Sequence, residues 1–466
     1  MKVSLACAVW FFFLAFVSSL PFIFLSPFNG VLIWYVFSLG NFHTLIWGGS
    51  LASLNYAYVI AILTCVSWLF SRTAKKRLPL TPLVIMTLLF SLWITITSYY
   101  ALAPEEDVWT RWTTVQKILL MGLVGYALTT TRERVDQLIW AVALTIGAWG
   151  VKGAILGSLH GGSGIHGPDQ GMLAGNNEFG LGLIMIFPLL FYHWHLATNR
   201  HLRRGLMLMG FLVAVAVLLT YSRGALIGAC AMGAVFWLRS RAKFATGLLI
   251  LALAFSVYSF APKAWFQRMG TIEAFQEDGS AMSRIYLWKV SLRIAELHPV
   301  TGGGFRVTYW PMITNNMLRG TDLPRLVIPR AAHSIYFEAL SEQGWVGLAL
   351  FLMVLTYSWF NCSWLIRHSR DRPDLAWANL LGRMGQPVLV GYTTAGAFAS
   401  LAYLDEYWCI IFIFDAARRL VAREIATPAS ASAAAPSMMP RAPRQDAAAA
   451  GLATFDARVS YAKRDS

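Results

Sequence analysis

The chain has 466 residues, of which 57% are hydrophobic and only 13% are charged, and its mean hydropathy is +0.55. In soluble proteins roughly a quarter of all residues are charged, so this composition excludes a soluble enzyme and predicts an all-α, polytopic integral membrane protein. The net charge of +15 would suit nucleic acid, but Lys and Arg lie in short clusters between hydrophobic runs, as membrane topology requires. We therefore expect membrane lipid, and no nucleic acid, among its partners.

The hydrophobic runs predict about 12 to 13 transmembrane helices, since one span needs about 20 apolar residues. In chain order they cover residues 5–25, 28–42, 54–70, 82–100, 113–130, 136–156, 174–196, 205–221, 224–238, 244–261, 344–366, 384–402 and 406–421. Pro21 and Pro27 interrupt the first two, so residues 1–42 cross once or twice. The runs divide the chain into an N-terminal bundle (1–261), a large polar loop (262–343), C-terminal membrane helices (344–422) and a tail (423–466).

Basic clusters alternate along the chain with loops that lack them. The clusters are predicted to be cytoplasmic, and the intervening loops to face the periplasm of a bacterium. The cytoplasmic set contains Arg72, Lys75, Lys76, Arg77, Arg132, Arg134, Arg200, Arg203, Arg204, Arg239, Arg241, Lys243, Arg367, Arg370 and Arg372. The opposite set contains residues 105–107, 157–171, 221–224, 262–343 and 405–406. We therefore expect a protein of the bacterial inner membrane with a cytoplasmic C-terminus. Its Ala-, Pro- and Ser-rich tail is predicted to be disordered.

The polar loop at 262–343 carries the first group of candidate residues. Apolar positions recur every three or four residues between 280 and 297, which predicts a helix. Its apolar face would contain Ile285, Trp288, Leu292 and Ala295. Arg284 lies off that face, where it either binds an anion or rests on lipid headgroups. The glycines at 302–304 allow a tight turn or the close approach of a ligand.

His333 closes the loop, and Glu338 follows it. We expect His333 to lie in the first turn of a helix, where free backbone N–H groups favour an anion. Gly344 comes 11 residues later, about three helical turns, so it would share the face of His333 and let another element pack closely. His333 is either catalytic or a structural residue with a hydrogen bond at the membrane interface.

Arg223 lies in a tight turn between two apolar runs, on the side that the positive-inside rule disfavours. An arginine there is costly, which favours anion binding over an interfacial anchor, and its planar guanidinium suits phosphate. Asn177 opens a membrane helix at the same side, where it either caps the helix or contacts substrate. His160 and His166 lack the spacing of metal ligands, and we predict no metal. Nothing resembles a nucleotide-binding glycine loop.

Three groups of residues resemble the O-antigen ligase and polymerase-like superfamily of bacterial polytopic glycosyltransferases. They are Ser222-Arg223-Gly224-Ala225, then Ser283 to Trp288 followed by Glu296 to Gly302, and finally His333 with Gly344. Residues 27–31 and 41–47 look like the putative O-glycosylation ligases associated with exosortase systems. The resemblance covers residues 1–422. One departure is Ile227, which stands where the family pattern has Leu.

The resemblance implies a C-type glycosyltransferase fold with one large periplasmic loop. The implied reaction moves a glycan from undecaprenyl diphosphate to a lipid or protein hydroxyl at the periplasmic face, without metal, nucleotide or other cofactor. Arg223 and Arg284 would bind the diphosphate, and His333 would activate the acceptor hydroxyl or orient the donor. Asn177 and Glu338 are further candidates for substrate contacts.

Two other functions stay open. A polymerase that joins repeat units would carry the same motifs. A polysaccharide transporter or flippase would instead line a path with these residues. Transporters are expected to show charges in several spans or helices broken at the midplane, whereas the polar candidates here gather at one face.

Overall fold

The computed structural model describes residues 2–45, 54–72, 77–159, 164–240, 242–245, 247–248, 251–252, 266 and 279–426. Every regular element in these ranges is helical, as the composition predicts. Most of the predicted run at 244–261 lies outside the described residues. So do His160, most of the first part of the polar loop and residues 427–466.

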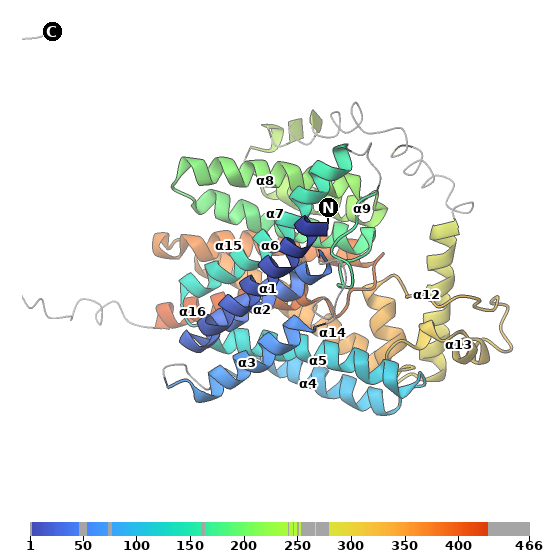
Figure 1. The fold of residues 1–466 in the computed structure, drawn as a ribbon. Coiled ribbons are helices and arrows are strands. Elements are labelled where there is room, and N and C mark those ends of the chain that lie inside the picture. The colour runs from blue at the N-terminus through green and yellow to red at the C-terminus, as the bar shows by residue number, and fades with distance from the viewer. Residues whose placement is uncertain are drawn as a thin grey trace, which may run out of the picture. The chain divides into compact units, whose positions relative to one another are not determined.

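The helices of the N-terminal half follow the predicted runs, with ends that differ by a few residues (Figure 1). They are α1 (Lys2–Leu25), α2 (Pro27–Gly40), η1 (Phe42–Leu45), α3 (Tyr56–Phe70), α4 (Pro82–Tyr99), α5 (Glu105–Leu128), α6 (Arg132–Leu159), α7 (Asn176–Leu196), α8 (Arg200–Leu219) and α9 (Arg223–Arg239). The start of α5 is the largest difference, because the predicted run began only at residue 113. Three acidic residues occupy the first turn of α5, where the helix dipole favours negative charge.

The C-terminal half contains the remaining described elements. They are α12 (Gly279–Leu297), η2 (Val307–Tyr309), α13 (Pro311–Met317), α14 (Ile335–His368), η3 (Pro373–Leu375), α15 (Ala376–Gly396) and α16 (Asp405–Ala426). Among the described residues, α4, α6, α7, α8 and α14 are long and apolar enough to cross a membrane, and α2 and α3 are shorter apolar helices. The chain is therefore an all-α, polytopic membrane protein.

Helix α16 lies in the core and ties the N-terminal and C-terminal helices together. Residues 405–417 are buried, although this helix carries acidic side chains. Its Trp408 stacks on Phe90 of α4 with ring centroids 5.8 Å apart. Asp415 accepts hydrogen bonds from Asn361 of α14 at 2.9 Å and from Thr81, just before α4, at 2.6 Å. These contacts hold α16 in place, and the segment 397–404 that leads into it contributes to the site described below.

Helix α12 stands across the ends of the bundle, at the right of Figure 1, and packs on α13 and α14. The helix was predicted correctly, but its buried face only in part, since Ala295 is fully buried as expected. Leu292 is 39% exposed, whereas Leu287, Val290 and Ile294 are fully buried. The face is rotated because α12 has two partners. Val290 and Ile294 join an apolar cluster with residues from η2 and α13, while Trp288 stacks on Phe337 of α14 at 5.3 Å.

Candidate active site

Loops far apart in the sequence converge at one end of the bundle. The amide of Leu102 donates a hydrogen bond to the carbonyl of Gly303 at 3.0 Å. The amide of Ile165 donates to the carbonyl of Leu219 at 2.9 Å. The amide of His333 donates to Ser400 Oγ at 2.8 Å. Gly303, Ile165 and His333 belong to the set that lacks basic clusters, and their partners Leu102, Leu219 and Ser400 lie within a few residues of it. The structure therefore gathers together loops that the charge pattern assigned to one side of the membrane.

The Gly-rich turn at 299–304 docks on a break in α14. Gly344 has a φ of 67° and a ψ of −171°, which interrupts the helix and leaves carbonyl groups without partners inside it. The amides of Gly303 and Gly304 donate to Ser341 O at 2.8 Å and Glu342 O at 3.0 Å. The close approach expected at Gly344 is thus present. The continuous helix from His333 to Gly344 is not, because a residue with positive φ cannot continue a right-handed helix.

His333 lies before α14 and not in its first turn. Ser334 is the N-cap, and His333 takes the left-handed conformation with φ 50°. This conformation is uncommon for a residue other than glycine and is concentrated at functional sites. The bond to Ser400 holds the backbone in place, while Nδ1 of His333 is buried without a hydrogen-bond partner in the described part of the chain.

The imidazole of His333 is neutral at physiological pH. Burial lowers its pKa to about 4, and the nearby positive charges of Arg284 and Arg330 act in the same direction. A ring nitrogen of a neutral imidazole can accept a proton, which a charged imidazolium cannot. The site therefore holds a base whose strength depends on the charge that surrounds it.

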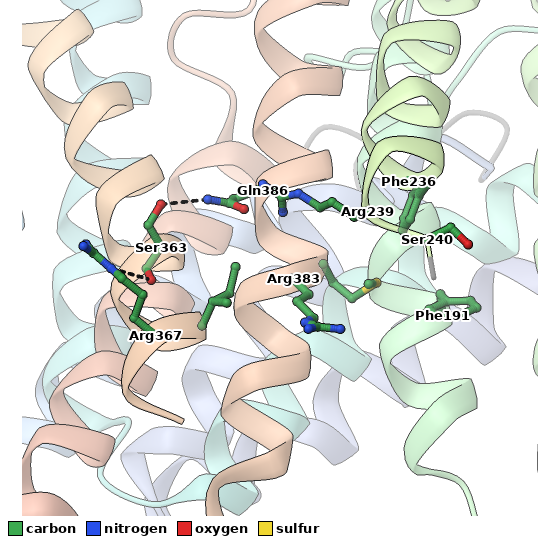
Figure 2. A pocket seen from close by; sticks show the side chains of 10 residues that line it. Phe191, Phe236, Arg239, Ser240, Ser363, Arg367, Arg383 and Gln386 are labelled. Carbon is green, nitrogen blue, oxygen red and sulfur yellow. Dashed lines mark hydrogen bonds between the residues drawn. The ribbon is translucent and has the colours of Figure 1, made fainter. Parts of the chain in front are cut away.

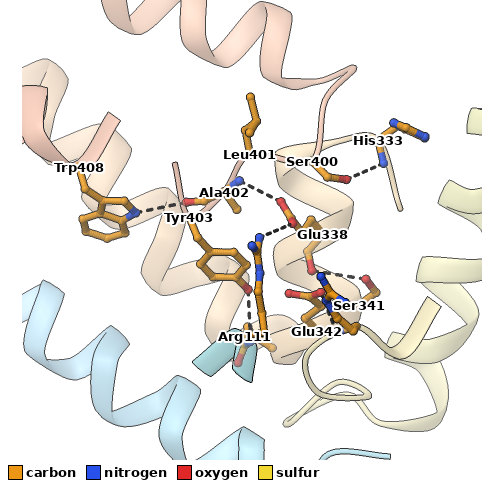
Figure 3. A network of polar contacts seen from close by, with 12 residues as sticks. Arg111, His333, Glu338, Ser341, Glu342, Ser400, Leu401, Ala402, Tyr403 and Trp408 are labelled. Carbon is orange, nitrogen blue, oxygen red and sulfur yellow. Dashed lines mark hydrogen bonds and ion pairs between the residues drawn. The ribbon is translucent and has the colours of Figure 1, made fainter. Parts of the chain in front are cut away.

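A cavity of about 330 Å³ opens beside His333. It is lined by Arg111, Met172, Gly175, Glu178, Arg306, Tyr309, Ala331, His333, Glu338, Glu342, Ser400 and Leu401. Figure 3 shows how helix α14 and the 400–403 segment present their polar groups to one another. Oε1 of Glu338 lies 3.7 Å from Nη2 of Arg111, and its Oε2 accepts a hydrogen bond from the amide of Ala402 at 2.9 Å. The guanidinium of Arg111 also lies 5.6 Å from the ring centroid of Tyr403.

The second carboxylate of the cavity belongs to Glu342, one turn after Glu338. Its Oε1 accepts from the amide of Arg306 at 3.0 Å, whereas Oε2 is buried without a partner among the described residues. Arg306 is left-handed, with φ 60°, and its guanidinium lies 5.2 Å from the Tyr309 ring centroid. The cavity thus combines two arginines, three acidic side chains and a neutral imidazole, a set that can donate hydrogen bonds to a ligand and accept a proton.

The predicted residues fall into two groups around this cavity. His333 and Glu338 line it. Arg284, Arg223 and Asn177 are not among its lining residues, but Arg284 lies within electrostatic range of both His333 and Glu178. Arg223 is the first residue of α9, after the N-cap Ser222.

The capping role considered for Asn177 is wrong. The N-cap of α7 is Gly175, which gives no side-chain cap. Asn177 instead accepts a hydrogen bond from Ser222 Oγ at 2.8 Å, and Asn176 donates to Thr220 O at 3.0 Å. The first turn of α7 therefore connects the turn that carries Arg223 to Glu178, which lines the cavity.

Sequence reasoning missed Arg111, Arg306 and Glu342. Arg111 had the same signal as Arg223, an arginine at the end of a hydrophobic run on the side that the positive-inside rule disfavours. Because the predicted hydrophobic run started only at residue 113, Arg111 fell outside it. Nothing in the sequence indicates that Arg306 and Glu342 meet, because the left-handed backbone at residue 306 brings them together. Among the described residues no group of His, Cys, Asp or Glu has the arrangement of a metal site.

Comparison with known families divides the chain into two matched parts. Residues 208–352 match the family model described as O-Antigen ligase, and residues 8–197 match a family of unknown function, DUF5935. A search of the curated proteins found no match. The first match includes His333, Arg223 and Arg284 and supports the O-antigen ligase superfamily. Both matched parts contribute residues to the cavity. Arg111 and Glu178 belong to the match at residues 8–197, and His333 belongs to the match at residues 208–352.

Proposed function

We propose that the protein is a membrane glycan ligase that transfers a saccharide from undecaprenyl diphosphate to a hydroxyl of a lipid or protein acceptor. The observation that carries the proposal is the neutral His333 beside the arginine-lined cavity, within the part of the chain that matches O-Antigen ligase. The proposed reaction takes place at the periplasmic face of the bacterial inner membrane. Assignment to the ligases associated with exosortase systems rests on the resemblance of residues 27–31 and 41–47.

The proposed chemistry is a displacement at the anomeric carbon of the donor sugar. The acceptor oxygen forms a bond to this carbon while the bond between the carbon and the diphosphate oxygen breaks, and the electron pair leaves with undecaprenyl diphosphate. The unprotonated ring nitrogen of His333 accepts the proton of the acceptor hydroxyl. The free energy comes from the lipid-linked diphosphate, so the step needs neither a nucleotide nor a metal.

The leaving group would be stabilised by arginines. Arg111 and Arg306 line the cavity, and Arg284 is close enough to lower the pKa of His333. Fixed cations in a partly dry site stabilise a developing diphosphate more strongly than they would in water. Arg223 is assigned to the same role because the turn that carries it is connected to the first turn of α7, which reaches the cavity. Glu338 would hold Arg111 in place, and Asn177 would hold the turn of Arg223.

A bound diphosphate would also activate the base. The positive charges of Arg284 and Arg330 depress the pKa of His333 in the free protein. An anion placed among these arginines compensates their charge, so the pKa of His333 rises when the donor binds. The imidazole then becomes a stronger base in the complex that needs one.

The test is to reconstitute the purified protein in liposomes with lipid-linked glycan and acceptors and to follow release of undecaprenyl diphosphate by mass spectrometry. A ligase adds one donor glycan to the acceptor, whereas a polymerase lengthens the lipid-linked glycan. Movement of lipid-linked glycan between leaflets without release would assign a transporter. His333→Ala should abolish release while donor binding persists, and wild-type turnover by this variant would remove His333 from the mechanism. EDTA should not alter the rate, and a loss that added metal restores would contradict the metal-free reaction.

A further inference from the structure

A second and larger cavity, of about 720 Å³, lies at the other end of α14 (Figure 2). His333 precedes the first residue of α14, whereas this cavity is lined by Ser363 and Arg367 near its last residue. At about 1.5 Å per residue, the unbroken part of α14 between Gly344 and Ser363 alone separates the two sites by roughly 30 Å. The remaining walls come from α7, α9 and α15. This cavity is therefore separate from the proposed active site.

Three arginines from three different helices line the cavity. They are Arg239 at the end of α9, Arg367 in α14 and Arg383 in α15. Within the described part of the chain, none of them lies within ion-pair distance of a carboxylate. Arg367 Nε donates only to the Ser363 carbonyl at 3.4 Å, and the Arg239 guanidinium lies 5.9 Å from the Trp359 ring centroid.

The positive charges at this cavity also repel one another. Arg239 and Arg383 are close enough for each charge to disfavour the other. A structural explanation accounts for Arg239 and Arg367, which lie near the C-terminal ends of their helices, where the dipole favours a cation. That explanation does not extend to Arg383, which lies in the N-terminal half of α15. An anion between the arginines would compensate all three charges.

Gln386 supplies an independent indication of a ligand. The residue lines the cavity and is only 3% exposed, and its Nε2 donates to Ser363 Oγ at 2.7 Å. Its Oε1 is buried without a hydrogen-bond donor among the described residues. A buried amide oxygen without a partner is costly, so a ligand that donates a hydrogen bond would stabilise it. The ionised oxygens of a phosphodiester satisfy the arginines but cannot donate, so a phosphodiester ligand needs a hydroxyl to reach Gln386 Oε1.

The apolar part of the cavity faces the outside of the bundle. Phe191 and Phe236 line the cavity, and Phe191 is 39% exposed. Phe360 of α14 and Leu238 of α9, each a few residues from a lining residue, are 56% and 61% exposed. In a membrane protein such side chains contact acyl chains. The volume lies within the 300–1,000 Å³ or so that is typical of small-molecule sites.

We propose that this cavity binds an anionic, hydroxyl-bearing phospholipid. The phosphate lies among Arg239, Arg367 and Arg383, and a headgroup hydroxyl donates to Gln386 Oε1. The acyl chains run along Phe191 and Phe236. Basic pockets between transmembrane helices bind anionic headgroups by the same electrostatics. The site is independent of the glycan chemistry proposed for the cavity beside His333.

Native mass spectrometry of the purified full chain tests the proposal, with phosphatidylglycerol, phosphatidylmethanol and phosphatidylcholine as probes. Phosphatidylglycerol should bind well ahead of phosphatidylcholine. The double variant Arg239→Gln/Arg383→Gln should weaken phosphatidylglycerol binding about 30-fold, as expected when two basic residues are removed. The matched control is Arg200→Gln/Arg204→Gln, which removes the same charge from exposed positions of α8 and should leave binding unchanged.

The headgroup hydroxyl has its own test. Gln386→Leu should weaken phosphatidylglycerol about two- to tenfold and phosphatidylmethanol, an anionic phosphodiester without a headgroup hydroxyl, not at all. Equal binding of phosphatidylglycerol and phosphatidylcholine to the wild type overturns the proposal without any variant. A control pair that weakens binding as much as the cavity pair overturns it too. If inorganic phosphate raises the melting temperature as much as phosphatidylglycerol does, the ligand is a soluble phosphate and the lipid assignment is wrong.

Discussion

Gly302 and Gly344 lie backbone against backbone. A Cβ atom on Gly302 would fall 2.6 Å from the amide nitrogen of Gly344, and one on Gly344 would fall 2.8 Å from that of Gly302 and 2.2 Å from the carbonyl oxygen of Val300. Both residues have positive φ, at 66° and 67°. The contact holds the Gly-rich turn against the break in α14, between the turns that carry Glu338 and Glu342 and the membrane-spanning part of the helix. Neither neighbour can yield easily, because the atoms that clash belong to the backbone.

Gly344→Ala should therefore destabilise the protein by about 2–4 kcal/mol, from steric overlap and the positive φ together. Gly320→Ala separates the two causes, since Gly320 has φ 75° but no atom within 4 Å of the place that its Cβ would take. It should cost only about 1–2 kcal/mol. Gly205→Ala, in an open position of helix α8, should be neutral or slightly stabilising. Thermal unfolding in detergent measures all three, and equal losses at positions 344 and 320 would contradict the close contact.

The lowered pKa of His333 predicts a pH-dependent stability. Above pH 6.5 the imidazole is neutral in both the folded and the unfolded chain. Between pH 6.5 and about 4 the unfolded chain binds a proton that the folded chain does not, so the free energy of unfolding falls as the pH falls. His333→Gln should flatten this part of the profile, whereas His201→Gln, at an exposed position, should not. Melting temperatures between pH 4 and 8 test this, and identical profiles for wild type and His333→Gln would show that His333 is not buried as described.

The activity profile should shift with donor binding. Because kcat/KM reports the free enzyme, its acidic limb should follow the pKa of about 4 for His333. The acidic limb of the kcat profile reports the complex with the donor. There the diphosphate compensates the charges of Arg284 and Arg330, so this limb should lie at higher pH. Arg330→Gln should raise the pKa seen in kcat/KM by removing one of the two charges. Coincident limbs would mean that the donor phosphate does not approach these arginines.

The pair of Arg111 and Glu338 should contribute to stability as well as to the site. Its side chains are only 20% and 8% exposed, and Glu338 also accepts from Ala402. Glu338→Leu should cost about 1–3 kcal/mol because it leaves the Ala402 amide and Arg111 without their acceptor. Glu338→Gln keeps an acceptor for the amide and should cost less. A double-mutant cycle with Arg111→Gln measures the coupling, which the exposed pair Arg372–Asp374 should lack. No coupling between Arg111 and Glu338 would contradict the role assigned to the pair.

The sequence predicted the helices far better than it predicted the site. Long apolar runs define helices locally, and most helix ends lie within a few residues of their runs. Arg223 could be singled out because an arginine is costly at its position, whereas His333 and Arg284 were assigned roles through the motifs that resemble the O-antigen ligase superfamily. The contacts of Glu342 with Arg306, and of the Gly-rich turn with Gly344, could not be predicted, because they depend on positive φ angles at residues 306 and 344. The position of His333 just before its helix has the same cause, since a left-handed residue leaves no pattern in the surrounding side chains.

Arg223 gives the most direct test of diphosphate binding. It begins α9 directly after the Ser222 cap, and Ser222 is in turn bonded to Asn177. Arg223→Lys preserves the charge but replaces a planar, two-pronged donor with a single ammonium group. We expect a loss of kcat/KM of about tenfold or more, with little change in melting temperature, since a hydrogen bond to a charged group contributes about 1.5–3 kcal/mol. Arg204→Lys, at an exposed position of α8, serves as the matched control and should retain full activity. Full activity of Arg223→Lys would instead assign Arg223 to anchoring α9 at the membrane interface, and the diphosphate would then depend on the arginines of the cavity alone.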